Sequence, residues 1–187
     1  MELRPSRLPG AYEIRLSPIE DPRGYFLCVY DVPSFRQHGL VTEWMQENQS
    51  LSRRMHTLRG LHFQVPPHSE TKLVRCLQGS VWDVFVDLRT ASPTYGQWDA
   101  ITLAADSFNA AYIPKGFAHA FCTLTPDAIV SYRVDATYAP DSQAGLAWND
   151  PALGIPWPTA TPFVSERDAR MPTLDALGEP FAGWAGS

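Results

Sequence analysis

Seventeen prolines are scattered along the 187-residue chain, and their spacing limits the folds that it can adopt. Proline breaks the interior of a helix and is excluded from the middle of a sheet, so the regular elements between the prolines must be short. These intervening runs are rich in Val, Tyr, Phe and Trp and end at Gly, Asp or Ser, and no run keeps a helical period. The pattern is typical of an all-β sandwich or barrel.

The clearest predicted hairpin spans residues 72–88, with its turn at Gln78-Gly79-Ser80. In its second strand, Asp83 and Asp87 alternate onto the same face as Val81 and Phe85. Two interpretations of this face are open. It lines a partly polar interior, or the two acids are solvated on an edge strand.

Other segments carry weaker signals. Val130, Tyr132 and Val134 alternate, so a strand over 128–134 is predicted to point Tyr132 inward. A short helix is predicted over residues 33–38, with Asp31 as its N-cap. The remaining predictions are a strand that breaks into a turn over 113–117, an ordered proline-rich loop over 151–173, and a tail or short helix over 173–187. We therefore expect one domain over residues 1–187, with its core at about 10–172.

Charge and apolar content exclude several classes of protein. A net charge of −5 argues against non-specific nucleic-acid binding. No apolar run approaches the roughly 20 residues of a membrane-spanning helix, and the N-terminus lacks the apolar region of a secretory signal. Cys28, Cys76 and Cys122 have no metal-binding spacing, so reduced thiols and a cytoplasmic protein are expected.

Two histidines stand among apolar residues, His62 in the run 58–64 and His119 in the run 117–121. Either alone is more often a core residue than a catalyst. Small β-barrel enzymes often bind a metal through two His two residues apart, a nearby Glu and a later His. Here Gln64 takes the place of the second His, so Glu70 and the two histidines are a weak match and no metal is predicted.

Other catalytic signatures are missing as well. The chain has no nucleophile elbow, no phosphate-cradling loop and no dinucleotide fingerprint. The remaining chemistry is acid–base catalysis without metal or organic cofactor. It would use a His as base, an inward Tyr as acid and an inward Lys or Arg to stabilise a developing enolate.

Ordered motifs from about residue 10 to 170 carry a family resemblance. They are 21–26 (DPRGYF), 46–50 (QENQS), 58–64 (LRGLHFQ), 72–75 (KLVR), 83–89 (DVFVDLR), 92–96 (SPTYG), 113–119 (IPKGFAH), 148–151 (WNDP) and 165–168 (SERD). With these motifs the chain resembles the dTDP-4-dehydrorhamnose 3,5-epimerases of the cupin superfamily. The resemblance implies a jelly-roll β-barrel with short flanking helices and a C-terminal extension. It also implies a homodimer with N-terminal strands crossing between subunits, and a role in dTDP-rhamnose biosynthesis.

The resemblance also implies a role for individual residues. His62 falls at the catalytic base and Asp168 at its carboxylate partner, Tyr132 at the acid, and Lys72 at the cation that stabilises the enolate. Tyr138 falls at an aromatic position that stacks in the site. The substrate-binding positions are Arg23, Gln46, Asn48, Arg59, Lys72, His119, Tyr138, Gln143 and Arg167. Arg59 and His62 are three positions apart and would point to opposite faces of a regular strand, so a bulge or turn near Gly60 is predicted if both reach one pocket.

Four positions depart from the family pattern. Cys28, Gln143 and Lys115 stand where Glu is frequent, and Arg167 stands where Lys is frequent. The expected substrate is dTDP-4-dehydro-6-deoxy-D-glucose, epimerised at C3 and C5. Because these positions concern recognition, a CDP- or GDP-linked 4-keto sugar, a heptose, and epimerisation at one carbon stay open. A metal-dependent cupin enzyme and a non-catalytic sugar-nucleotide binding module are more distant alternatives.

Overall fold

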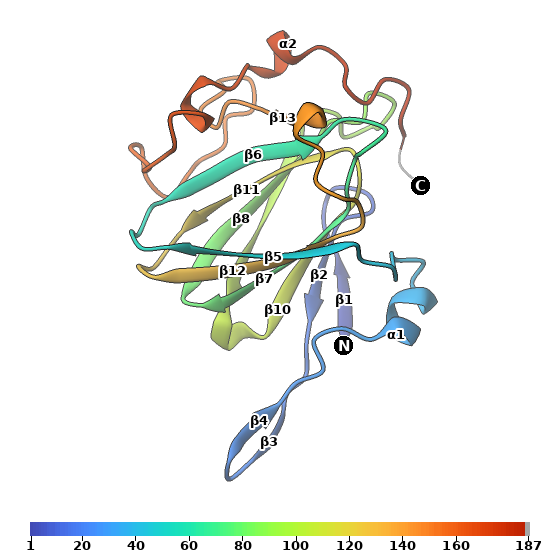
Figure 1. Cartoon of the computed structure of the whole chain (residues 1–187), viewed down its shortest axis with the longest axis vertical. Coiled ribbons are helices and arrows are strands. Elements are labelled where there is room, and N and C mark those ends of the chain that lie inside the picture. The colour runs from blue at the N-terminus through green and yellow to red at the C-terminus, as the bar shows by residue number, and fades with distance from the viewer. Residues whose placement is uncertain (186–187) are drawn as a thin grey trace.

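The computed structural model describes residues 1–185, and its strands form two main sheets and a separate hairpin (Figure 1). The six-stranded sheet has the order β1 (Glu2–Pro5), β2 (Tyr12–Arg15), β10 (Asn109–Ile113), β7 (Lys72–Gln78), β12 (Ala128–Val134) and β5 (Gln46–Ser52). The five-stranded sheet has the order β13 (Gln143–Gly145), β6 (Leu58–Gln64), β11 (Phe117–Thr123), β8 (Ser80–Asp87) and β9 (Trp98–Ala104). The hairpin pairs β3 (Ile19–Asp21) with β4 (Gly24–Phe26). The helices are α1 (Val32–Gln37), α2 (Leu174–Leu177) and the 3₁₀ turns η1 (Ala105–Ser107), η2 (Pro140–Ser142) and η3 (Asp168–Arg170).

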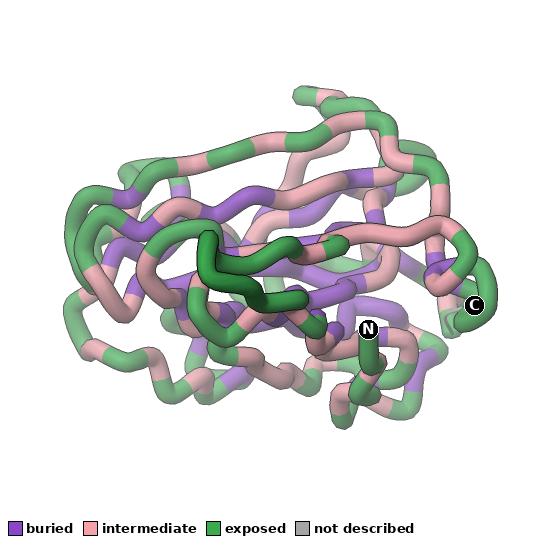
Figure 2. The backbone as a smooth tube through the Cα atoms, turned by 90° about the horizontal axis from the view of Figure 1, so that it is seen from below, coloured by how far each residue is buried: buried purple, intermediate pink, exposed green. Residues whose placement is uncertain are grey.

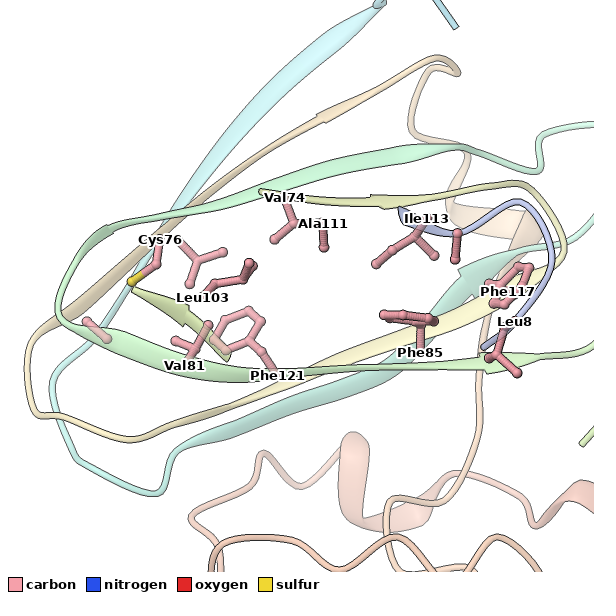
Figure 3. Packing of buried hydrophobic residues seen from close by; sticks show 13 residues of the cluster. Leu8, Val74, Cys76, Val81, Phe85, Leu103, Ala111, Ile113, Phe117 and Phe121 are labelled. Atoms are coloured by element: carbon pink, nitrogen blue, oxygen red, sulfur yellow. The ribbon is translucent and has the colours of Figure 1, made fainter. Parts of the chain in front are cut away.

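The two sheets face each other across an apolar core. Val74 and Ile113 reach into it from the six-stranded sheet, and Phe85 and Phe121 reach into it from the five-stranded sheet (Figure 3). Burial of these side chains provides the main driving force for closing the sandwich. The predicted all-β jelly-roll class is confirmed. Its two sheets remain separate in the part of the chain that the structure describes, so the barrel is an open sandwich.

Strand β8 is buried on both faces. Phe85 points into the sandwich, whereas Val86 and Leu88 point outward beneath a second apolar cluster. Asp83 and Asp87 are fully buried, and β9 flanks β8, so the solvated-edge interpretation of these acids is wrong. The two strands predicted over 72–88 are present as β7 and β8, on either side of Gly79, but they lie in different sheets and do not pair, so the hairpin prediction is wrong.

The C-terminal part of the chain covers the outer face of the five-stranded sheet. Phe181 is 1% exposed and packs against Phe63 and Trp184. The predicted loop over 151–173 is ordered, contains η3 near its end and leads into α2, the predicted short helix. Residues 186 and 187 of the predicted tail lie outside the described residues.

Helix α1 packs against the face of the six-stranded sheet that points away from the sandwich core. The Ser34 amide donates a 2.9 Å hydrogen bond to the Asp31 carboxylate, which caps the helix as predicted, and Pro33 lies in the first turn. Phe35 is fully buried in a third cluster with Ile14 and Tyr112.

The β3–β4 hairpin projects away from the sandwich, at the opposite end from β6, β13 and α2 (Figure 1). Figure 2 shows buried backbone concentrated along the central strands, with exposed segments around them. Ile19, Tyr25 and Phe26 on the hairpin are 69%, 59% and 69% exposed, an unusual group of largely exposed apolar side chains, of which Tyr25 contacts Phe108. None of the helices within residues 1–185 has the length and apolar character needed to cross a membrane.

Candidate active site

A cavity with two lobes opens between the sheets, and the lobes share His62, Lys72 and Tyr132. The first lobe, of about 490 Å³, is also lined by Arg59, His119, Phe121, Phe163, Arg167 and Asp168. The second lobe, of about 320 Å³, is also lined by Gln46, Asn48, Gln64, Glu70, Tyr138 and Gln143. The shared residues come from β6, β7 and β12, so both sheets contribute to the place where the lobes meet.

A bulge in β6 brings Arg59 and His62 to the same cavity. His62 lies opposite His119, and Arg59 lies opposite Phe121, so two residues of β6 face the single residue Ala120 of β11. The bulge requires glycine, because Gly60 has φ +126 and a Cβ there would lie 2.4 Å from the Ala120 Cβ. The bulge predicted from strand parity is therefore confirmed.

The bulge also positions the partner of His62. The His62 Nε2 atom lies 2.7 Å from Asp168 Oδ1, and the Gly60 amide donates to Asp168 Oδ2 at 3.2 Å. Burial opposes ionisation of Asp168, but the hydrogen bonds from His62 and Gly60 outweigh it and hold the Asp168 pKa below its usual value. An ionised Asp168 accepts a hydrogen bond from Nε2–H of His62, which leaves Nδ1 as the nitrogen that can take a proton.

Tyr132 stands on the facing sheet. It lies on β12, half-buried against the apolar core, and lines both lobes. Burial, and after it the charge of Glu70, raise the pKa of Tyr132 above its usual value. The hydroxyl therefore keeps its proton at neutral pH and can donate it.

Gln64, Glu70 and Lys72 form a network in the second lobe. The Lys72 ammonium lies 3.1 Å from Glu70 Oε1, and Gln64 Nε2 donates to Glu70 Oε2 at 3.0 Å. Gln64 also binds the backbone on both sides of Tyr138, since Nε2 lies 3.3 Å from the Thr137 carbonyl and Oε1 accepts from the Ala139 amide at 2.7 Å. Gln64 thus links the lysine to the loop that presents the aromatic ring.

The residues weighed as metal ligands are engaged elsewhere. His62 points to Asp168, His119 Nε2 lies 2.8 Å from Asp83 Oδ2, and Glu70 binds Lys72. Within residues 1–185, no three His, Cys, Asp or Glu side chains are grouped as a metal site. The arrangement is one of paired acids and bases.

The polar residues predicted for substrate binding lie mostly along the cavity. Gln46 Nε2 donates to Asn48 Oδ1 at 2.6 Å, and the Tyr138 hydroxyl donates to Gln143 Oε1 at 2.9 Å, both in the second lobe. Arg59, His119 and Arg167 line the first lobe, where Arg59 donates to Ser52 and to the Leu51 carbonyl.

Arg23 is the exception among the predicted site residues. It lies on the projecting hairpin, where its 89%-exposed side chain binds Asp21. Cys28 and Lys115, two of the departures from the family pattern, also lie outside both lobes, and Lys115 pairs with Asp135.

Phe121, Phe163 and Glu70 are among the lining residues that were not singled out as site residues from the sequence. Phe121 has a recognisable signal, because it shares a strand face with His119. Phe163 lies in the irregular loop, where its backbone pairs with Thr57, and no periodicity marks it. Glu70 was considered only as a weak metal ligand, since its contact with Lys72 cannot be seen in residue spacing alone.

Comparison with known proteins gives one consistent result. The family model described as dTDP-4-dehydrorhamnose 3,5-epimerase matches residues 5–176. The dTDP-4-dehydrorhamnose 3,5-epimerase of Sinorhizobium fredii is 44% identical over 169 residues, covering 90% of this chain and 87% of the relative. The dTDP-4-dehydrorhamnose 3-epimerase of Streptomyces niveus is 41% identical, covering 90% of this chain and 81% of that protein.

A solved structure agrees along nearly the whole chain. It is the dTDP-6-deoxy-D-glucose-3,5-epimerase of Legionella pneumophila in complex with dTDP-4-keto-L-rhamnose. The TM-score is 0.93 at 31% sequence identity, with 99% of each chain covered. The chain therefore belongs to the dTDP-4-dehydrorhamnose 3,5-epimerase family.

Proposed function

We propose that this protein is an isomerase that inverts C3 and C5 of dTDP-4-dehydro-6-deoxy-D-glucose to give dTDP-4-dehydro-L-rhamnose. The observation that carries the proposal is the placement of a carboxylate-backed base, His62, and a protonated acid, Tyr132, on facing sheets around one cavity. Epimerisation requires this arrangement, because the stereocentre inverts only when the proton returns from the opposite side. A binding module would need neither group.

The first step removes a proton next to the keto group. The C4 carbonyl acidifies the hydrogens on C3 and C5, and Nδ1 of His62 takes one of them. The C–H electron pair forms the C=C bond of an enolate, and the negative charge moves onto O4. The Lys72 ammonium, between the two lobes, stabilises that oxygen, and Asp168 stabilises the imidazolium that forms.

The second step returns a proton to the other side of the sugar. Tyr132 donates its hydroxyl proton to the carbanionic carbon, the C=O bond re-forms, and the configuration is inverted. Proton exchange with water then restores the neutral Tyr132 and the free base His62. Repeating the cycle at the second carbon completes the reaction.

The rest of the cavity suits a nucleoside diphosphate. The amides of Gln46, Asn48 and Gln143 offer hydrogen bonds in the second lobe, beside the exposed ring of Tyr138. Arg59 and Arg167 provide cationic donors for phosphate oxygens in the first lobe. We propose these residues, with His119, as the substrate-binding set, within a catalytic domain core of about residues 10–172.

We further propose that the active form is a homodimer. The resemblance implies that Arg23 binds substrate, and Arg23 lies on a hairpin that projects away from the sandwich of its own chain (Figure 1). The exposed apolar side chains of that hairpin need a partner surface. If the hairpin packs on a second copy of the chain, these side chains become covered and Arg23 reaches the cavity of that second copy.

The test is to incubate the purified protein with dTDP-4-dehydro-6-deoxy-D-glucose in D₂O and follow deuterium at C3 and C5 by NMR. Deuterium at both carbons and rhamnose-configured product are expected. His62→Ala and Tyr132→Phe should lose turnover, whereas His38→Ala, at an exposed histidine outside the cavity, should keep it. Deuterium at C3 alone would make this chain a 3-epimerase, the activity named for the Streptomyces niveus relative. No exchange at either carbon, or full turnover in His62→Ala, would overturn the assignment.

A further inference from the structure

The side chain of Glu70 contacts the proposed catalytic residue Lys72, although the proposed mechanism gives Glu70 no role of its own. It is 14% exposed and lines the second lobe, and its Oε1 atom lies 3.1 Å from the Lys72 Nζ atom, whose side chain is 9% exposed. Its other oxygen accepts a hydrogen bond from Gln64, which is itself buried and anchored to the backbone around Tyr138. Gln64 thus fixes one oxygen of the Glu70 carboxylate, and the other oxygen contacts the Lys72 ammonium.

We propose that Glu70 is a positioning residue that fixes the Lys72 ammonium at the junction of the two lobes. This inference rests on the proposed function, because Lys72 matters as the group that stabilises the enolate. A lysine side chain has four rotatable bonds and loses about 2 kcal/mol of rotamer entropy when it is ordered. Glu70 and the His62 carbonyl, 3.4 Å from Nζ, order it before substrate arrives and leave one N–H free for the sugar.

The charge of Glu70 also affects the acid on the facing sheet. After burial, which is the larger cause, this carboxylate is the group that raises the Tyr132 pKa. One side chain therefore forms the ion pair with Lys72 and favours the neutral hydroxyl of Tyr132, which the reaction requires. Glu70→Gln removes the charge at nearly constant shape, and the amide still offers an oxygen to Gln64.

The sequence supplies a direct probe of the ion pair, because Lys72 and Lys115 are the two lysines of the chain. Protein labelled with ¹³Cε-lysine gives one resonance from each, assigned with Lys115→Arg. Lys115 pairs with Asp135 outside the cavity and serves as the internal reference. Glu70→Gln should move the Lys72 resonance and leave that of Lys115 in place. Glu179→Gln, at an exposed glutamate outside both lobes, should move neither.

Kinetics provide the second measurement. Glu70→Gln should lower kcat roughly 10- to 100-fold while KM for the nucleotide sugar stays about the same, because the lysine contact matters most in the transition state. If Glu70→Gln does not fold, Glu70→Asp, which keeps the charge but retracts it, is measured in the same two ways.

An unchanged Lys72 resonance in the folded variant, or an unchanged kcat in an active enzyme, would overturn the inference. If the wild-type protein instead catalyses no exchange in D₂O, the proposed function fails. The lysine spectra of the ligand-free protein would still decide whether Glu70 holds Lys72.

Discussion

Assignment of Arg23 to the partner's cavity can be tested by mixing two defective chains. His62→Asn removes the base from a subunit's own site, and Arg23→Ala removes the cation that the hairpin carries. If each cavity combines its own His62 with the partner's Arg23, a heterodimer of these variants has one intact site and one doubly defective site. If Arg23 serves its own chain, both sites are defective.

The structure sets the size of each effect. Loss of the general base costs about 100- to 10,000-fold in kcat. Loss of a charged contact worth about 1.5–3 kcal/mol lowers kcat/KM roughly 10- to 100-fold. The Arg23–Asp21 pair is surface-exposed, so its removal leaves folding almost unchanged. One intact site in two gives the isolated heterodimer about half of the wild-type activity.

The assay uses co-expression with two different affinity tags, purification of the heterodimer, and deuterium incorporation into the sugar. Arg53→Ala is the matched control, because Arg53 is an exposed arginine outside the cavity with only a 3.9 Å contact to Asp127. It should be fully active alone. A heterodimer no more active than the better of its two parent variants would refute the exchange of Arg23 between subunits, and so would a monomer in light scattering.

Three further results are expected from single substitutions or titration. Gly60→Ala places a Cβ 2.4 Å from that of Ala120, so kcat/KM should fall about 100-fold. Gly178 also has a positive φ, +75, but a Cβ there would meet no atom within 4 Å, so Gly178→Ala should be active. Equal activity of the two variants would contradict the role of the bulge. In protein labelled with ¹³Cζ-tyrosine, the Tyr132 resonance, identified by its loss in Tyr132→Phe, should titrate above pH 10, because burial and a nearby carboxylate disfavour the phenolate; a midpoint below 10 would contradict this. Phe181→Ala should lower the free energy of unfolding in urea by about 3–5 kcal/mol, since Phe181 is 1% exposed, and a loss below 1 kcal/mol would mean that the C-terminal cover is loose in solution.

Local patterns in the sequence predicted the features that depend on neighbours along the chain. The alternation of residues 81–88, the cap at Asp31 and the parity conflict between Arg59 and His62 all correspond to observed geometry. Whether Asp83 and Asp87 are buried could not be decided in this way, because burial depends on β9 pairing along the outer side of β8.

The same limit applies to parts of the cavity. Phe163 reaches the first lobe from an irregular loop by pairing with Thr57, more than a hundred positions earlier in the chain. Glu70 is close to Lys72 in sequence, but its significance comes from Gln64 and from the distant Tyr132. Long-range packing places these residues, and no periodicity in a single sequence reports it.

The span of the Asp168 contacts has a kinetic consequence. Asp168, whose carboxylate orients His62, lies 106 positions after His62 in the sequence. The same carboxylate binds the amide of Gly60 in the bulge, 108 positions earlier. Contacts between residues so far apart in sequence are expected to form late in folding, because closing a long loop costs conformational entropy. During refolding, circular dichroism should therefore recover before turnover does, and the lag between the two signals would measure the docking of the C-terminal segment.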